Sequence, residues 1–383
     1  MASQGGDSWF ARLFGAEELA YEETQALFKL EREGEDEVLV APNGRRFRPG
    51  RFEAPSLAEL RATAPVPAGG ELEVKNIVGD VREAHVQPEA AGAVFQAASQ
   101  FNCLEFIRAN SEPEDGVRIY EFDRTQGPSC ALACAASSVW RNYFMPMGPD
   151  GGEPRGQRRD RQLNNLRDVQ ALLGDGLLEV RNGYTFAEDV EAIARRVEAM
   201  SEEERDGLRG AVRIGVQWDA EVTDQRMEYK KNSAGKWANV GTDCPPVTQV
   251  FCSALALGSS PRLRLWRPLA QLVLDAAYEA TLAVAARNLH RGGSRDVYLT
   301  LLGGGNFGNG PKWIQSAVQR ALELYKGSGL RVKLLHLSDR APWMGAYRQI
   351  AASFGPESPG VGMTFSDSED EEEGQGDGPS EGS

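Results

Sequence analysis

The stretch VYLTLLGGGNFGNGPKWIQSAVQRAL at 297–322 decides the fold class of this chain. Its first six residues are apolar or β-branched, which predicts a buried strand. Three glycines follow, and a helix is expected to begin at Pro311, where the missing N–H of proline costs nothing. A second strand-like run, RVKLLHL at 331–337, comes next. Strand, helix and strand in this order are typical of an α/β fold.

The glycine-rich loop between this strand and helix is the first candidate for a ligand site. Glycines let a backbone approach a ligand closely, and the amides at the start of a helix bind phosphate. We therefore predict a phosphate-binding loop, made of Gly303, Gly304, Gly305, Asn306, Phe307, Gly308 and Asn309.

The same loop also matches the dinucleotide-binding pattern G-x-G-x-x-G through Gly303, Gly305 and Gly308. That pattern belongs at the first strand of its unit, with an acidic residue about 20 positions later. Here it lies near the C-terminal end, and the first acid after the next strand is Asp339. A nucleotide-dependent oxidoreductase is therefore only an alternative.

Outward from this unit, strand and helix patterns alternate along the chain. Strands are predicted at 71–81, 116–122, 212–223 and 247–257, and helices at 88–101, 129–143, 162–174, 185–199 and 267–288. This alternation predicts an α/β sandwich with a mixed sheet.

Composition divides the chain into three parts. Residues 1–70 form an N-terminal extension of helix and short strands that ends in a Pro/Gly linker. Residues 71–350 form the main domain, with insertions near 145–161 and 225–246. Residues 356–383 are mostly Gly, Ser, Pro and acidic residues, with too few apolar side chains to bury a core, so we predict a disordered acidic tail.

Charge and composition exclude several classes of protein. The chain has 42 Lys and Arg residues against 56 Asp and Glu residues, and nine of these acids lie in 357–383. The remaining residues therefore carry a net charge of about −5. They lack the excess of basic residues that is typical of a nucleic-acid binder. Asp275 and Glu279 interrupt the longest apolar run, which argues against a membrane span. The N-terminus has no secretory pattern. We expect a cytoplasmic protein, with a nuclear location left open.

Cysteine and histidine spacing points away from metals and disulfides. The five cysteines form no C-x-x-C pair, and the three histidines are scattered. We expect reduced thiols, no structural zinc site and no cofactor; the residues require no metal, and Mg²⁺ between carboxylates is left open. Cys130 and Cys134 are interpreted as packing residues of a small-residue helix, and His336 as a core residue of its strand.

The stretch VKNIVGDV at 74–81 resembles macrodomains, which bind or hydrolyse ADP-ribose conjugates. In that family a strand ends in a similar Gly-Asp turn. The resemblance implies that the side chain of Asp80 binds the adenine amine and that the backbone amide of Val81 binds a ring nitrogen.

The block 96–143 is similar to one branch of that family. It contains ASQFNCLEF (98–106), EDGVRIYEFDRTQGPSCALACA (114–135) and WRNYF (140–144), which resemble the macrodomain-like ADP-ribosyl-ubiquitin hydrolases of the Legionella effector type. The resemblance spans roughly 71–340. It implies a three-layer α/β/α sandwich, and as substrate ADP-ribose on a protein side chain, with arginine of ubiquitin as the specific case.

The resemblance also implies roles for the residues around this pocket. Gln100 and Asn102 stand where the family has an N-A-A-N loop and would approach the distal ribose. Thr125, Gln126 and Gly127 would surround the diphosphate together with the glycine-rich loop.

Acidic residues between 105 and 123 are the candidates for catalysis. Hydrolysis of an ADP-ribosyl bond needs a carboxylate to stabilise positive charge or to activate water. Asp115 and Asp123 match the spacing of two family aspartates, with Glu121 as a third candidate. A straight strand of eight residues spans about 26 Å, so both aspartates reach one site only if the chain folds back. Ala133 stands where a further aspartate is expected, so a non-catalytic ADP-ribose reader is the alternative.

Overall fold

The computed structural model describes residues 8–63, 70–148, 152–224, 246–258 and 260–355. Almost all of the insertion expected near 225–246 and the acidic tail at 356–383 lie outside these residues.

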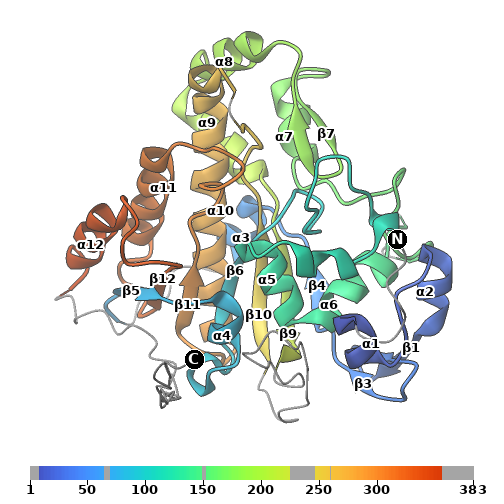
Figure 1. Ribbon diagram of the computed structural model, residues 1–383. Coiled ribbons are helices and arrows are strands. Elements are labelled where there is room, and N and C mark those ends of the chain that lie inside the picture. The colour runs from blue at the N-terminus through green and yellow to red at the C-terminus, as the bar shows by residue number, and fades with distance from the viewer. Residues whose placement is uncertain (1–7, 64–69, 149–151, 225–245, 259, 356–383) are drawn as a thin grey trace, which may run out of the picture.

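A seven-stranded mixed sheet forms the centre of the molecule (Figure 1). Its strands, in spatial order, are β4 (Arg51–Glu53), β9 (Gly215–Ala220), β10 (Val247–Cys252), β6 (Val94–Ala98), β11 (Asp296–Leu299), β12 (Arg331–His336) and β5 (Glu73–Val78). The five strands from β10 to β5 are parallel, whereas β9 runs antiparallel to both of its neighbours. The carboxyl ends of five strands therefore lie along one edge of the sheet.

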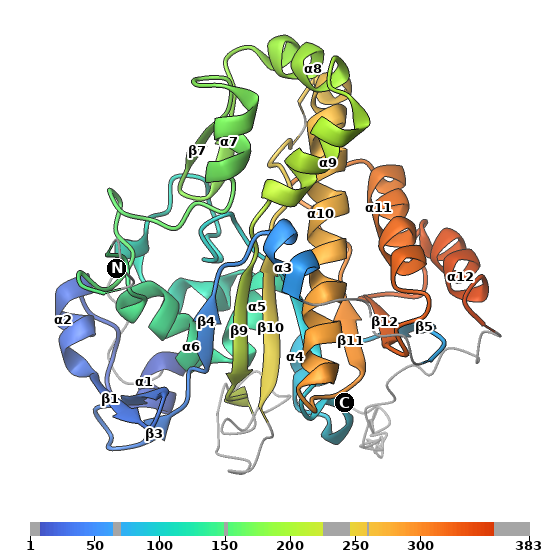
Figure 2. The same cartoon turned by 180° about the vertical axis from the view of Figure 1, so that it is seen from behind.

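Helices cover both faces of this sheet, so the expected three-layer α/β/α sandwich with a mixed sheet is confirmed. One face carries α3 (Leu57–Thr63), α8 (Val190–Glu198), α9 (Glu202–Ala211), α10 (Leu263–His290) and α11 (Pro311–Leu324), with α10 in the middle (Figure 2). The other face carries α4 (Val81–His85), α5 (Gln126–Ala133) and α6 (Ala135–Val139) (Figure 1). The helix α12 (Met344–Ala352) packs beside β5.

Side chains alternate between the two layers of the core along each strand. Val94 and Leu334 belong to the cluster around α10, whereas Phe95 and Leu335 belong to the cluster under α4 and α5. Burial of both faces is the rule for parallel sheets and explains why these strands read as continuous apolar runs.

The helix α10 is 28 residues long. Within the described part of the chain it is the one helix long and apolar enough to cross a membrane by length and composition, but 94% of its most apolar window is buried. It is therefore packed as the central core helix of the α/β sandwich.

The N-terminal residues form a small unit against α6 and also contribute to the main sheet. This unit contains α1 (Trp9–Phe14), α2 (Tyr21–Leu27) and the sheet of β1 (Lys29–Glu33), β2 (Asp36–Val40) and β3 (Arg46–Phe47). The next residues form β4, which pairs with β9, and α3, which packs on α10. The extension is thus joined to the central fold by a strand and a helix.

A further excursion lies at the carboxyl end of the sheet. It contains α7 (Arg167–Leu173) and the hairpin of β7 (Glu179–Arg181) and β8 (Tyr184–Phe186).

Two predicted elements are wrong. The expected helix at 88–101 is a short 3₁₀ turn, η1 (Pro88–Ala90), followed by β6. The alanines of this segment favour a helix locally. Pairing with β10 and β11 and burial of both faces stabilise a strand instead, and this outweighs the helix propensity.

The expected strand at 116–122 is the second wrong element. The chain forms two 3₁₀ turns there, η2 (Pro113–Asp115) and η3 (Arg118–Phe122). The carboxylate of Glu18 accepts hydrogen bonds from the backbone N–H groups of Val117 and Arg118, at 2.8 and 2.7 Å. These donors are therefore not free to pair with a neighbouring strand.

Candidate functional site

A cavity of about 860 Å³ opens at the carboxyl ends of the parallel strands. Each strand contributes a residue just beyond its end: Asp80 after β5, Ser99 after β6, Ala254 after β10, Thr300 after β11 and Leu337 after β12. This edge is where open α/β sheets bind ligands, because the loops that follow the strands converge there. The volume falls in the range of pockets for small organic molecules.

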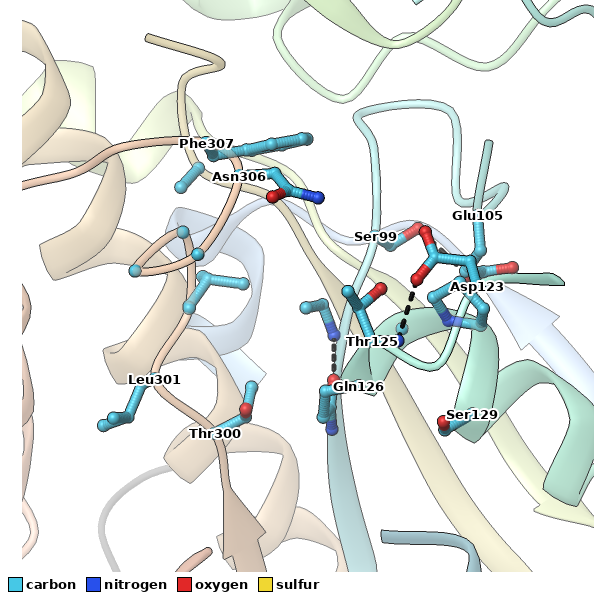
Figure 3. A pocket seen from close by; sticks show the side chains of 18 of the residues that line it. Ser99, Glu105, Asp123, Thr125, Gln126, Ser129, Thr300, Leu301, Asn306 and Phe307 are labelled. Carbon is cyan, nitrogen blue, oxygen red and sulfur yellow. Dashed lines mark hydrogen bonds between the residues drawn. The ribbon is translucent and has the colours of Figure 1, made fainter. Parts of the chain in front are cut away.

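Two walls face each other across the cavity (Figure 3). Thr300, Leu301, Asn306 and Phe307 lie on one side, in the loop between β11 and α11. Ser99, Glu105, Asp123 and Thr125 lie on the other side, in the segments that follow β6 and precede α5. We call these the glycine wall (residues 300–307) and the carboxylate wall (residues 99–106 and 123–129).

The glycine wall is shaped by its own sequence and by one buried tyrosine. Gly303 has a φ of +74°, a left-handed value that favours glycine, and an added Cβ would lie 2.5 Å from that of Ala254. The hydroxyl of Tyr278 in α10 donates to the carbonyl of Thr300 at 2.7 Å and accepts the N–H of Leu302 at 2.9 Å. An added Cβ on Gly305 would meet nothing within 4 Å. Its backbone is therefore open to a ligand.

Five residues of the predicted loop line the cavity and two do not. Gly303, Gly304, Gly305, Asn306 and Phe307 are lining residues. Gly308, with φ +66°, packs against the carbonyl of Gly258, and Asn309 is buried and donates to the carbonyl of Leu255 at 2.8 Å. The last two residues therefore hold the loop in place from behind, and are not positioned to contact a ligand.

The start of α5 forms the middle of the carboxylate wall. Thr125, Gln126 and Gly127 all line the cavity. The first amides of a helix have no partner inside it, so the N–H groups of Gln126 and Gly127 are suited to an anion, whereas that of Thr125 donates to Asp123. An added Cβ on Gly127 would clash with the carbonyl oxygen of Ala98, which shows how closely α5 approaches β6.

The side chain of Gln126 has a structural task that the sequence did not indicate. Its oxygen accepts the N–H of Ala98 at 2.7 Å, and its nitrogen donates to the carbonyl of Gln96 at 2.7 Å. The pairing of β6 with β11 involves only Val94 and Phe95, so Gln126 takes the place of a strand partner beyond that point. The side chain of Gln126 is therefore occupied, and only its backbone is available to a ligand.

Asp123 is the predicted carboxylate that the structure places in the cavity. It is half-buried, and its Oδ1 accepts the N–H of Thr125 at 2.8 Å, which fixes it at the turn before α5 (Figure 3).

Asp115 and Glu121 do not line the cavity. Asp115 is exposed and forms a capping box with Glu112 in η2, where it accepts the N–H of Glu112 at 3.0 Å. Glu121 is half-buried on η3, and the pKa of its carboxyl is raised, first by burial, while Arg118 and Arg12 lower it. The chain forms the turns η2 and η3 there and no straight strand, and of the three acids Asp123 alone lines the cavity.

The other predicted ligand contacts divide in the same way. Asp80 and Val81 line the cavity, and Oδ1 of Asp80 caps α4 by accepting the N–H of Arg82 at 2.7 Å. Gln100 also lines it, but its amide binds both the N–H and the carbonyl of Phe106. Asn102 is fully buried outside the cavity lining and donates to Gln162 at 2.8 Å. Gln100 and Asn102 therefore fix the loop after β6.

Glu105 belongs to the acidic stretch 105–123 but is not one of the three acids predicted to be catalytic. It lines the cavity, its side chain has no exposed surface, and burial raises the pKa of its carboxyl to about 7. Arg141 and the hydroxyl of Ser99 lower that pKa but do not cancel the effect of burial. The Ser99 hydroxyl, itself at the cavity, donates to Oε1 of Glu105 at 3.2 Å.

The sequence contains a signal for Glu105. This residue comes directly after the apolar Cys103 and Leu104, in the loop that follows β6, but the residues of β6 were predicted to form a helix. With β6 assigned, the rule that ligand-binding residues follow parallel strands selects Ser99 to Glu105. Tyr184 and Phe186 of β8 also line the cavity, and only the tertiary structure brings this hairpin there.

The chemistry of the site is that of carboxylates and backbone amides. Within the described ranges no group of three His, Cys, Asp or Glu residues could hold a metal ion. His336 lines the cavity at the end of β12, with its Nε2 2.9 Å from Oδ1 of Asn76, and burial lowers the pKa of its imidazole to about 4.

Comparison with known proteins gives matches among solved structures alone. No protein-family model and no curated protein matches the chain. The poly(ADP-ribose) glycohydrolase of Deinococcus radiodurans, in complex with ADP-ribose, is 14% identical with a TM-score of 0.44; the match covers 79% of this chain and 95% of that chain. The poly(ADP-ribose) glycohydrolase of Thermomonospora curvata, bound to the inhibitor ADP-HPD, is 15% identical with a TM-score of 0.37, over 83% of this chain and 93% of that chain.

At these TM-scores the likeness decides neither the reaction nor the substrate. The neighbours are named for poly(ADP-ribose), and neither name mentions arginine or ubiquitin. The arginine and ubiquitin predictions therefore stay predictions, and the proposal below rests on the cavity of this chain.

Proposed function

We propose that this chain hydrolyses ADP-ribose from a modified protein side chain in the cavity at the carboxyl ends of the sheet. The observation that carries the proposal is the meeting of two walls of different chemistry. The glycine wall and the start of α5 offer backbone amides suited to a diphosphate. The carboxylate wall offers Asp123 and Glu105 to a bond that breaks with development of positive charge.

The ligand would lie with its adenine at Asp80 and Val81, as the resemblance to macrodomains implies. The diphosphate would lie between Gly303 to Gly305 and the first amides of α5, which face it from opposite sides. The distal ribose would then lie against Asp123. No metal or cofactor is part of the proposal.

Two carboxyl groups would share the hydrolytic step. As the bond between C1″ and the leaving nitrogen breaks, Asp123 stabilises the positive charge on the ribose and accepts a proton from the water that attacks C1″. For this step the hydrogen bond between Ser99 and Glu105 would reverse: the protonated carboxyl of Glu105 donates its proton to the Ser99 hydroxyl, which passes its own proton to the leaving nitrogen. With a pKa of about 7, Glu105 holds that proton on a large share of molecules at neutral pH.

The experiment combines binding and turnover. Calorimetry should detect ADP-ribose at micromolar Kd, about −8 kcal/mol. Release of ADP-ribose is then measured from proteins modified on arginine, glutamate or serine, from modified ubiquitin, and from poly(ADP-ribose). We further propose arginine as the linkage and ubiquitin as the carrier. Release from arginine conjugates supports this linkage, and release from modified ubiquitin supports this carrier. Release from another substrate would support the hydrolysis of ADP-ribose conjugates but assign it to a different linkage.

A non-catalytic reader of ADP-ribosylated proteins is the second candidate. Two observations favour it: Asp115 and Glu121 lie outside the cavity lining, and the side chain of Glu105 has no exposed surface. ADP-ribose binding without release from any member of the panel would replace the hydrolase proposal by the reader. Absence of ADP-ribose binding would reject both.

A further inference from the structure

Arg141 is a fully buried arginine behind the carboxylate wall. It lies in η4 (Trp140–Phe144), a π-helical turn that continues α6. Such turns are rare, and they occur often at functional sites. A buried guanidinium is costly unless its charge and its donors are met, so its contacts call for an explanation.

Those contacts converge on the loop that carries Glu105. The Nε of Arg141 donates to the carbonyl of Cys103 at 3.0 Å, and one terminal nitrogen lies 3.5 Å from Oε2 of Glu105 and 3.3 Å from the hydroxyl of Ser138. The guanidinium lies over the ring of Phe251, 3.7 Å from its centre. The other terminal nitrogen is buried without a hydrogen-bond partner among the described residues. Within the part of the chain that the structure describes, Glu105 is thus the one carboxylate that meets this buried charge.

The loop itself is held under strain at the residue that Arg141 binds. Cys103 has a φ of +59°, a left-handed value that costs energy in a residue other than glycine. The side chain of Asn102 accepts the N–H of Leu104 at 3.1 Å, and the hydroxyl of Tyr120 accepts the N–H of Glu105 at 3.2 Å. Strain of this kind persists where surrounding contacts determine the conformation. Arg141 supplies two of those contacts.

We propose that Arg141 is the positioning residue of this site, which holds the Glu105 carboxyl at the cavity and sets the pH at which Glu105 releases its proton. Arg141 is not among the residues that line the cavity, so it acts through Glu105 and does not contact substrate. This inference rests on the role given to Glu105 in the proposed function.

The groups that face Glu105 are few and differ in charge. Cys103 lies on the same loop, Tyr120 on η3 and Cys130 on α5, and burial raises the pKa of each so that all three stay neutral at physiological pH. Asp123 lies on the same wall and is half-buried. Arg141 is therefore the cation that opposes the effect of burial on the pKa of Glu105. Its removal should move that pKa further upward.

The test follows the protonation of Glu105 directly. The infrared band of its protonated carboxyl is identified as the difference between wild type and Glu105→Gln, and is followed from pH 5 to 10. In Arg141→Met the midpoint of this band should rise by about one to three pH units from its wild-type value. The alkaline limb of the kcat/KM profile should move with it. Arg141→Lys keeps the cation and should give a smaller shift.

The control removes a comparable ion pair elsewhere. Arg155 lies 2.6 Å from Glu37 and is also largely buried, but it does not line the cavity. Arg155→Met should leave both the infrared midpoint and the pH profile unchanged. An unchanged midpoint in a folded Arg141→Met protein would overturn the proposal, even if its turnover is lower.

The variants also separate this inference from the proposed function and from a failure to fold. The infrared titration needs no turnover, so an inactive wild type rejects the hydrolase while the role of Arg141 is still decided by the midpoint. Where Arg141→Met does not fold, the double variant Arg141→Met/Glu105→Gln removes both buried charges and should fold. The infrared midpoint of Glu105 in Arg141→Lys then decides. If the lysine is shown to be neutral, the positive charge is gone and the midpoint should rise. A midpoint equal to that of wild type in such a protein would reject the proposal.

Discussion

The two walls of the cavity are built in different ways from the same chain. The glycine wall is one continuous segment between β11 and α11, and three successive glycines bring its backbone to the cavity. The carboxylate wall joins the loop after β6 to the turn before α5, and it depends on Glu18, Tyr120, Gln126 and Arg141 for its shape. A local motif sets most of the first wall, with Tyr278 of α10 as its support from a distant segment. The second wall exists only once distant segments have packed together.

The largest effect should come from the carboxylate that faces the cavity. Asp123→Asn keeps the shape of the turn before α5 but removes the negative charge, which matters more in the transition state than in the bound ground state. We expect kcat to fall by about 10²- to 10⁴-fold. The Kd for ADP-ribose should change by less than about tenfold, ~1.4 kcal/mol. Single-turnover kinetics and calorimetry measure the two quantities.

Full turnover in Asp123→Asn would show that the carboxylate wall does not use this charge. A loss of binding that equals the loss of turnover would instead make Asp123 a ligand contact, and the contrast between a binding wall and a reacting wall would disappear.

The glycine wall should respond in binding and not in chemistry. Gly305→Val places a branched side chain in open space, so the fold should tolerate it while the approach of a diphosphate to the backbone is blocked. We expect the Kd for ADP-ribose to rise by about 10- to 100-fold, roughly 1.4–2.7 kcal/mol. Calorimetry measures the change.

Gly327→Val is the matched control. Gly327 also has open space around its would-be Cβ but lies outside the cavity lining. It should bind ADP-ribose as wild type does. An unchanged affinity in Gly305→Val would remove the assignment of this loop to the diphosphate.

Protonation of Glu105 predicts how stability depends on pH. Its pKa is raised to about 7 in the folded protein, against about 4.3 in an unfolded chain, so its contribution to stability is fully present below pH 4.3 and is lost as the pH rises through 7. Glu105→Gln cannot ionise and should gain on wild type between pH 5 and 8.5, by on the order of 1–3 kcal/mol. Urea unfolding at the two pH values checks this.

A constant difference between the two proteins would mean that Glu105 is ionised over the whole range. The carboxylate wall would then hold two permanently charged acids, and the proton for the leaving group would have to come from another source.

The smallest effects are expected at the two acids outside the cavity. Asp115→Ala should change kcat/KM by less than about twofold, and as a cap of η2 it should lose about 0.5–1 kcal/mol of stability. Glu121→Gln should likewise leave turnover close to wild type. A tenfold loss of kcat in either variant, with unchanged thermal stability, would place the reaction on η2 or η3 and not at Asp123.

The sequence predicted the glycine wall of the site better than the carboxylate wall. The pattern of 297–322 predicted the strand, the glycine loop and the helix, and the structure confirms these elements at β11 and α11. Asp80 and Val81 were placed from a local Gly-Asp turn, and both line the cavity. For the block 96–143 the motifs located the right region, but the strand β6 was taken for a helix. Glu105 was therefore not recognised as a residue at the end of a strand.

Sequence alone thus determined what neighbouring residues decide among themselves. The alternation of strands and helices, the glycine turn with Gly303 at positive φ and the Asx turn at Asp123 follow from backbone freedom and short side chains. The tertiary structure decided which acids reach the cavity and in what state of charge. Burial under α6 and η4 raises the pKa of Glu105 and pairs it with Arg141, because desolvation and Coulomb attraction act through space between segments that are 36 residues apart.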